Sequence, residues 1–243
     1  MWSIVLMLFA CNDEEKSSDT IDDTGNEQIE DTGLLEEDSG QEDTGVSDTE
    51  DTEDTEEEEC DPVVYDPNPF ITEVIEVEFG DGAGFGQDQF PSIVYGPPLG
   101  AGPNSGSLDV VSLGMNGFII VDFDQMIVDG EGPDLIVFEN VFIGWYETGI
   151  VSASVDGETW FTWDCDTEDS DNGYPGCAGA SPSLSHPNNC IDARDPELAG
   201  GDAFDLADIG LSEARYIRVA DSGASGPGGF DLDAIAIVNG TPE

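Results

Sequence analysis

The feature of this sequence that most limits its fold is a series of short apolar runs, each separated from the next by glycine, proline, asparagine or aspartate. The series starts after Cys60 and continues to the C-terminus. Short apolar runs bounded by turn-forming residues are typical of strands in an antiparallel sandwich or barrel. We find no long stretch with the 3.6-residue period of an amphipathic helix. The predicted strands cover residues 71–79, 108–113, 118–123, 135–138, 150–155, 159–163, 214–220 and 232–238.

Two dipeptides between these runs have the residue types of tight hairpin turns. Asn116-Gly117 precedes the run at 118–123, and Asp156-Gly157 precedes the run at 159–163. Both dipeptides favour the positive backbone angles of a hairpin turn. Residues 203–211 are compatible with a single helical turn.

Charge excludes several classes of partner. The chain has 56 acidic residues, 4 basic residues and a formal net charge of −52. Such a charge repels nucleic acid and anionic lipid headgroups. It also opposes compact folding unless it is spread along a tail, screened by salt or neutralised by bound cations. Arg215 and Arg218 fall on opposite faces of a predicted strand, so we expect at least one to pair with a buried or bordering carboxylate.

The first residues predict a lipid anchor. Residues 1–10 are mostly apolar but are shorter than the roughly 20 residues that span a bilayer. They fit the apolar part of a signal peptide, and Leu8-Phe9-Ala10-Cys11 resembles a bacterial lipobox. We therefore expect Cys11 to be lipidated and to provide the only membrane contact, in a cell-surface or outer-membrane lipoprotein of the bacterial envelope. The alternative is a free cysteine after an incidental apolar tail.

Residues 11–59 form a second compositional region. They almost lack aromatic residues and repeat Asp-Thr-Gly or Asp-Ser-Gly, ending in a run of aspartate, threonine and glutamate. Such a segment cannot bury enough apolar area to offset the entropy of ordering, and its like charges extend it. We expect a disordered acidic stalk, followed by one β-sandwich domain over residues 60–243.

The cysteines predict two disulfides. With Cys11 assigned to lipid, four cysteines remain, an even number for an exported domain, with three possible connectivities. Cys165 and Cys177 enclose a short loop and form the preferred pair, which leaves Cys60 with Cys190. A zinc site is the competing interpretation, but only His186 lies nearby and no Cys-x-x-Cys spacing occurs.

The order of several segments resembles a class of bacterial cell-surface lipoproteins marked by an FEN motif, here Phe138-Glu139-Asn140. The matching segments, in order, are GSLDVVSLGMNGFIIVDFDQMIVDGEGPDLIVFENVF, VSASVDGETW, GCAG, AGGDAFDLADIGLSEARYIRVAD and GFDLDAIAIVN. More distantly, VSASVDGETW and ARYIRVAD resemble strands of galactose-binding-like jelly-roll modules of the discoidin and carbohydrate-binding types. These resemblances imply a surface location and an all-β, antiparallel jelly-roll sandwich.

Acidic residues in the first and last strands predict a calcium site. Residues two apart in a strand project to one face about 6.5–7 Å apart, which pairs Asp231 with Asp233 and Glu76 with Glu78. Asp81 follows the first strand. Uncompensated carboxylates at a core edge are unfavourable, and Ca²⁺ is the expected remedy outside the cell. Both pairs resemble the calcium-holding elements of jelly-roll carbohydrate-binding modules. The alternative is that these carboxylates face solvent from an edge strand.

A binding surface is predicted just after the FEN motif. Glu139, Asn140, Trp145 and Tyr146 combine hydrogen-bonding groups with an aromatic pair in a loop, which suits a sugar. The alternative is that Trp145 covers the end of the core.

The sequence gives little support for catalysis. His186 is the single histidine and has no positioned nucleophile, and no phosphate-binding loop is present. We expect a non-catalytic, calcium-stabilised module that binds a surface glycan or extracellular matrix. The alternatives are a structural or adhesive envelope protein that binds other proteins and, third, a glycoside hydrolase.

Overall fold

The computed structural model describes residues 61–224 and 228–242. The predicted signal peptide, lipidated Cys11, acidic stalk and Cys60 lie outside the described residues. The strands are β1 (Glu73–Glu78), β2 (Val111–Ser112), β3 (Phe118–Asp122), β4 (Gln125–Val128), β5 (Leu135–Glu139), β6 (Gly149–Ser154), β7 (Phe161–Thr162), β8 (Asp202–Phe204), β9 (Glu213–Ala214), β10 (Tyr216–Asp221), β11 (Asp231–Ile237) and β12 (Gly240–Pro242).

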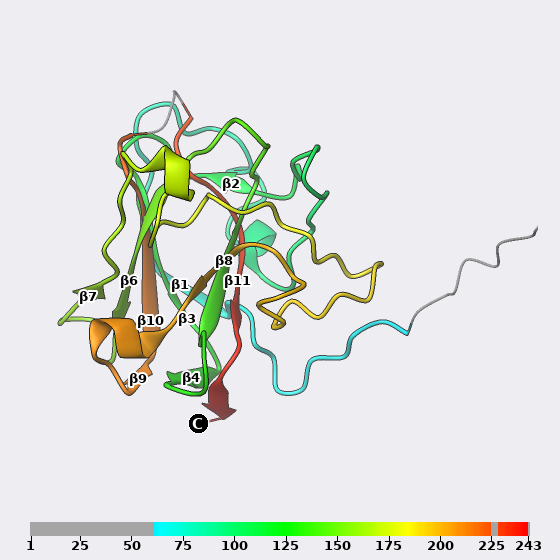
Figure 1. Ribbon diagram of the computed structural model, residues 1–243, viewed down its shortest axis with the longest axis vertical. Helices are drawn as coiled ribbons and strands as arrows, with labels where there is room; N and C mark the ends of the chain where they lie inside the picture. The colour runs from blue at the N-terminus through cyan, green and yellow to red at the C-terminus, as the bar shows by residue number, and fades with distance from the viewer. Residues whose placement is uncertain (1–60, 225–227, 243) are drawn as a thin grey trace, which may run out of the picture. The chain divides into compact units, whose positions relative to one another are not determined.

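Two sheets face each other across the core, which confirms the predicted antiparallel β-sandwich (Figure 1). One has the order β1-β3-β10-β6-β7 and the other β2-β11-β5-β8. A third, small sheet has the order β12-β4-β9. All strand pairs in the described part of the chain are antiparallel.

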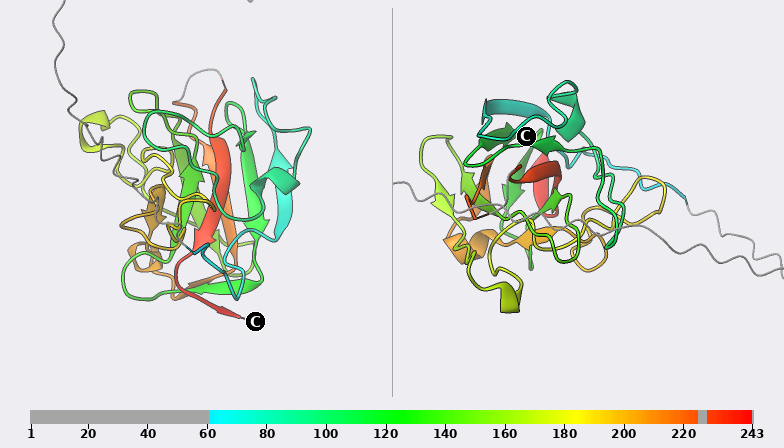
Figure 2. Two further views of the ribbon diagram at one scale, coloured as in Figure 1. Left: turned by 90° about the vertical axis from the view of Figure 1, so that its right-hand side faces the viewer. Right: turned by 90° about the horizontal axis from the view of Figure 1, so that it is seen from above.

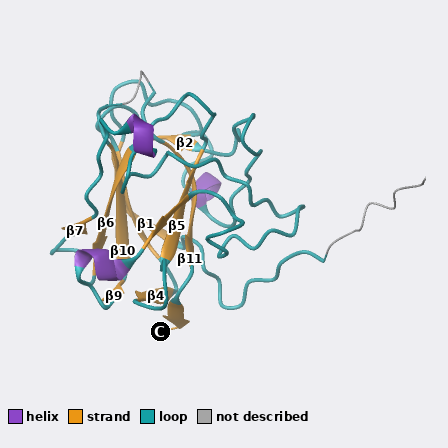
Figure 3. Ribbon diagram, in the orientation of Figure 1, coloured by secondary structure: helices purple, strands orange, loops and turns teal. Residues whose placement is uncertain are grey.

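Long loops connect the strands, and the described residues contain no α-helix (Figure 3). Three single 3-10 turns occur: η1 (Ser92–Val94), η2 (Ser170–Asn172) and η3 (Leu206–Ile209). The third lies within the predicted helical turn at 203–211. Asp205 caps it by accepting a hydrogen bond from the Ala207 N–H, and Gly210 ends it in the left-handed conformation.

The central strands of the four-stranded sheet are apolar on both faces because each face is covered. Along β11, Leu232 and Ile235 pack in the core between the sheets, whereas Ala234 and Ala236 pack in a smaller cluster with Phe70. The smaller cluster also includes residues from the loop before β8. Figure 2 shows this sheet from two further directions. Burial on both faces explains why the sequence of β11 lacks apolar–polar alternation after Asp233.

Every predicted strand contains at least part of an observed strand. The run at 214–220 divides between β9 and β10. Sequence analysis missed β4, β8 and β12, which are only three or four residues long and pair with neighbours distant in sequence. Such short segments show too few residues to establish a period.

The two predicted hairpin turns have different outcomes. Asp156-Gly157 lies between β6 and β7, which do pair, and the Asp156 carboxylate accepts bonds from the N–H groups of Glu158 and Thr159. Asn116-Gly117 forms a turn, with Asn116 at a φ of 61°. However, this turn joins β2 to β3, which belong to different sheets, so it is not a hairpin.

The predicted Cys165–Cys177 disulfide is present, with a Cα–Cα distance of 4.5 Å. Cys190 is also disulfide-bonded, while Cys60, its predicted partner, lies outside the described residues. The expected ion pair between an arginine and a buried carboxylate is also found, since Arg215 Nε lies 3.1 Å from Asp122 Oδ1.

Candidate metal centre

Three carboxylates converge at one end of the sandwich. Glu139 is the last residue of β5, Asp231 is the first residue of β11, and Glu147 lies in the loop that leads into β6. One carboxylate oxygen from each lies within 4.8 Å of those from the other two. We call these three residues the acidic triad.

Strand pairing brings two members of the acidic triad together. Leu232 lies opposite Glu139 in the β5–β11 ladder, so Asp231 and Glu139 are neighbours across adjacent strands. Glu147 returns to the same place after a tight turn in which the Trp145 N–H donates to the Phe142 carbonyl oxygen at 2.9 Å. Gly144 has a φ of 90° in that turn, the left-handed region that glycine adopts without strain.

The acidic triad is poorly hydrated. Glu139 has only 2% of its surface exposed, and both Glu147 and Asp231 are partly buried. Desolvation, followed by the charges of Asp231 and Glu147, raises the pKa of Glu139 well above its ordinary value. Desolvation and the charge of Asp231 raise the pKa of Glu147 to about 7. Desolvation also raises the pKa of Asp231 against the opposing effect of hydrogen bonds with Ser112 and Asn140.

The surrounding charges add to this repulsion. The charged groups that shift the pKa values of the acidic triad are all acidic and include Asp202 and Asp221. Arg194 pairs with Asp192, Arg215 pairs with Asp122, and Arg218 lies over the Phe118 ring. Among the described residues, therefore, no cationic side chain is among the charges that shift the pKa values of the acidic triad.

Two oxygens of the acidic triad have no hydrogen-bond partner although they are buried. These are Oε2 of Glu139 and Oδ1 of Asp231. A backbone hydrogen bond with Asn140 lowers the pKa of Glu139 but does not offset its desolvation. Buried polar atoms are satisfied in the great majority of cases, so two free oxygens at one place indicate a missing partner.

The arrangement fits a calcium ion. Oxygens bound to one Ca²⁺ at 2.3–2.6 Å can be at most about 5 Å apart, and the three oxygens of the acidic triad meet this limit. Carboxylates are the ligands that hard divalent cations prefer. An ion here would offset most of the charge of the acidic triad and complete the bonding of both free oxygens.

The structure does not gather the five predicted calcium ligands into one cluster. Only Asp231 belongs to the acidic triad. Glu76 and Glu78 are exposed on β1, the edge strand of the five-stranded sheet, and Asp81 is exposed in the turn that follows. The exposed glutamates agree with the alternative interpretation, in which charge on an edge strand discourages pairing with another chain.

A β-bulge separates Asp233 from Asp231. The β11 register shifts between Leu232 and Ala234, which places Asp233 as the extra residue. Both oxygens of Asp233 accept from the Leu99 N–H, at 3.2 and 3.1 Å. Desolvation raises the pKa of this carboxyl to about 7. The two aspartates were predicted to share a face because side chains alternate between the faces of a regular strand. The bulge interrupts this alternation between them.

The predicted ligand-binding residues surround the acidic triad. Glu139 is a member of the triad. A side-chain hydrogen bond with Asn140 lowers the pKa of Asp231, and one with Trp145 lowers the pKa of Glu147. Trp145 is 57% exposed, so it does not cover the end of the core. Tyr146 packs on Tyr174 with ring centroids 5.5 Å apart. Phe142 and Ile143 complete an exposed apolar turn.

Sequence analysis missed Glu147. Its role depends on the turn at residues 142–145, which reverses the chain toward the end of β5. The usable signal was its position two residues after Trp145, in a loop already considered for binding.

A second acidic cluster, Asp129, Asp134 and Asp205, is satisfied by the protein itself. Oδ1 of the fully buried Asp134 accepts from the Gly130 N–H and from Asn239 Nδ2, and Oδ2 accepts from the Leu206 N–H. This cluster organises loops around η3 and needs no ion to complete its bonding.

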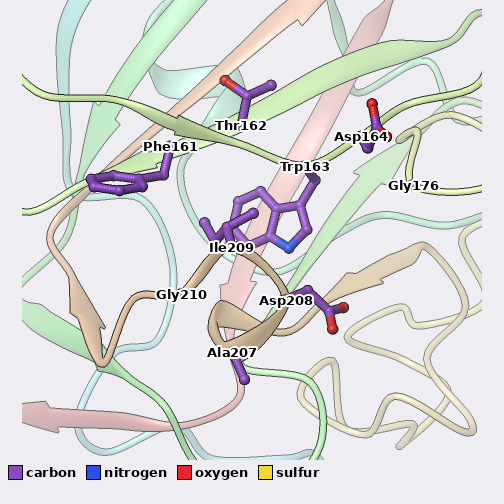
Figure 4. A pocket seen from close by; sticks show the side chains of 9 residues that line it. All are labelled: Phe161, Thr162, Trp163, Asp164, Gly176, Ala207, Asp208, Ile209 and Gly210. Atoms are coloured by element: carbon purple, nitrogen blue, oxygen red, sulfur yellow. The ribbon is translucent and has the colours of Figure 1, made fainter.

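A hollow of about 600 Å³ lies between β7 and η3, and none of the acidic triad lines it. Figure 4 shows Phe161 and Asp208 on its two sides. Trp163 lies deeper, is 5% exposed and donates its indole N–H to the Asp205 carbonyl oxygen at 2.9 Å. Trp163 is therefore a residue of the hydrophobic core.

Among the described residues, no helix has the length and apolar character needed to cross a membrane. The chain matches no protein-family model, and a search of curated proteins found no significant match.

Proposed function

We propose that this chain is a lipid-anchored bacterial cell-surface protein whose β-sandwich is a calcium-stabilised, non-catalytic module for binding a glycan or matrix ligand. Cys11 provides the anchor, and the acidic stalk carries the domain away from the membrane. The acidic triad holds the ion, in place of the ligand set expected from the sequence. The apolar turn at residues 142–145 supplies the surface for the ligand.

One observation carries the proposal: three carboxylates converge at the edge of the core, and two of their buried oxygens have no partner. A protein that kept these groups without a cation would lose stability both from repulsion and from the unsatisfied oxygens. A bound divalent cation reduces the repulsion and provides a partner for both oxygens.

The exposed turn supports binding as the function. Trp145, Ile143 and Phe142 are 57%, 65% and 41% exposed. Aromatic side chains next to fixed polar groups suit the apolar face and hydroxyls of a sugar. The same turn favours a second candidate, an adhesive envelope protein, because clustered exposed apolar side chains also suit a protein partner.

Thermal unfolding of the full chain with chelator and with Ca²⁺ tests the metal centre. At a Ca²⁺ concentration 100 times the dissociation constant, we expect stabilisation of about 2.7 kcal/mol. Glu139→Gln and Asp231→Asn should abolish this stabilisation. The matched control is the Glu76→Gln, Glu78→Gln double variant, which should retain it because both side chains are exposed on β1.

Equal melting with and without Ca²⁺ would refute the metal centre.

Ligand class is tested separately on a glycan array and on a matrix-protein panel. Calcium-dependent glycan binding that Trp145→Ala weakens supports the proposal, whereas protein binding without sugar competition supports the adhesive alternative. Glycan turnover that Glu139→Gln abolishes would identify a hydrolase.

A further inference from the structure

We infer that the ion at the acidic triad is incompletely coordinated by the protein and binds its ligand directly, through two adjacent hydroxyl groups of a neutral sugar. This inference rests on the proposed function and names the chemistry of ligand recognition at the same site.

The first step is the count of available oxygens. Each carboxylate of the acidic triad has a hydrogen-bond donor beside it: the Asn140 backbone for Glu139, the Asn140 side chain for Asp231 and the Trp145 side chain for Glu147. Glu139 and Asp231 each keep one buried oxygen without a partner, and Glu147 offers one oxygen within 4.8 Å of theirs, so we count one oxygen from each carboxylate for an ion. Ca²⁺ takes six to eight oxygens, so three to five positions are left for other ligands.

Asn140 Oδ1 is a third buried oxygen without a hydrogen-bond partner, and counting it as a ligand of the ion still leaves two to four positions for other ligands. Its Oδ1 faces Gly106, where an added Cβ would lie 1.7 Å from this oxygen. Gly106 thus lets the Asn140 amide pack against the backbone. The Asn140 side chain also takes part in the hydrogen bonding that lowers the pKa of Asp231.

The second step is the direction in which the open positions face. Glu139 lies on the buried side of the acidic triad, whereas Glu147 is only partly buried and bonds to Trp145, which is 57% exposed. The open positions therefore face the exposed turn. A ligand bound to the ion on that side would contact the Trp145 ring.

The third step is charge. Three carboxylates and one Ca²⁺ leave a net charge of about −1 by formal count, and nearby Asp202 and Asp221 add to it. A ligand carboxylate or sulfate would be repelled here. Neutral oxygens are favoured, and two adjacent sugar hydroxyls supply them in pairs while the apolar face of the ring packs on Trp145.

Terbium luminescence of the full chain tests this inference. Tb³⁺ replaces Ca²⁺ at oxygen sites, and its lifetimes in H₂O and D₂O count the water molecules bound to the ion. The probes are the methyl pyranosides of mannose, galactose, fucose and glucose. The acidic comparison is the methyl glycoside of galacturonate, which keeps its free carboxylate. We expect at least one neutral glycoside to displace about two waters and galacturonate to displace none.

Two variants separate the roles of the ion and the turn. Trp145→Ala should weaken glycoside binding about tenfold while Ca²⁺ affinity changes little, and Trp145→Phe should restore most of the binding. Absence of Tb³⁺ and Ca²⁺ binding would overturn the proposed function itself. Metal binding with an unchanged water count for every neutral glycoside, or displacement by galacturonate alone, would overturn only the present inference.

Discussion

Asp202 illustrates how a single buried carboxylate is held without an ion. Its Oδ2 accepts hydrogen bonds from the backbone N–H groups of Gly179, Ala180 and Ser181, at 2.7, 3.0 and 3.4 Å. These bonds lower the pKa of Asp202, but desolvation outweighs them and raises it to about 6. The contrast with Glu139 is informative, since Glu139 has an oxygen with no donor at all.

The raised pKa of Asp202 predicts a pH dependence of stability. In the unfolded chain this pKa is near 3.8 and in the folded protein about 6, so between these values the folded state binds more protons. Its contribution to stability is therefore greatest below pH 4 and is lost as pH rises through 6. Relative to Asp202→Asn, we expect the wild-type unfolding free energy to fall by on the order of 2–3 kcal/mol from pH 4 to 8.

Urea unfolding in chelator at several pH values measures this difference. Other carboxyl groups titrate in the same range, and the comparison with Asp202→Asn largely removes their contribution. Parallel stability curves for the two proteins would contradict the prediction.

At the scale of elements, apolar runs predicted the strands because strands form where apolar side chains can be buried. Such side chains can be recognised within a short stretch of sequence. Residues 232–238 and 135–138 became β11 and β5 with little change in bounds. Pairing partners were not predictable from local turn chemistry. Asn116-Gly117 has the residues of a hairpin turn, yet β3 pairs with β1 and β10.

The candidate site was only partly predictable for the same reason. Asp231, Glu139, Asn140 and Trp145 were each identified from the sequence, but in two separate predicted sites. What joined them was the pairing of β5 with β11, a contact between residues more than ninety positions apart. The bulge at Asp233 then redirected one predicted ligand to Leu99. Neither the pairing of these strands nor the bulge can be recognised from a few consecutive residues of sequence.

The loop closed by the Cys165–Cys177 disulfide gives a prediction at this scale. Within it, η2 is capped by Asp169 and ended by Gly173 in the left-handed conformation, and none of the η2 residues is buried. The loop thus has little core to hold it. Chain-entropy arguments for its sequence separation of 12 give a stabilisation of about 3 kcal/mol.

We therefore expect Cys165→Ser, Cys177→Ser to lower the unfolding free energy by about that amount, measured by urea unfolding. Ca²⁺ stabilisation should persist in this double variant, because neither cysteine belongs to the acidic triad. A change below about 0.5 kcal/mol would show that the unfolded chain is not appreciably restrained by this bond.

The whole molecule combines a strongly apolar interior with an acidic exterior. Apolar side chains from both sheets pack together in the main core, whereas the formal net charge of the chain is −52. Two separate electrostatic effects follow. Repulsion among exposed carboxylates is long-range and is screened by any salt, whereas repulsion within the partly buried acidic triad is short-range and is relieved only by an ion that binds there.

These effects predict different responses to salts. Raising NaCl from about 0.01 to 0.15 M shortens the screening length from roughly 30 to 8 Å, so the melting temperature in chelator should rise steeply over this range and then level off. Ca²⁺ added at constant ionic strength should raise it further, and Glu139→Gln should lose this second increase while keeping the first. A single response common to Na⁺ and Ca²⁺, unchanged by Glu139→Gln, would mean that screening alone stabilises the fold and that the acidic triad holds no specific ion.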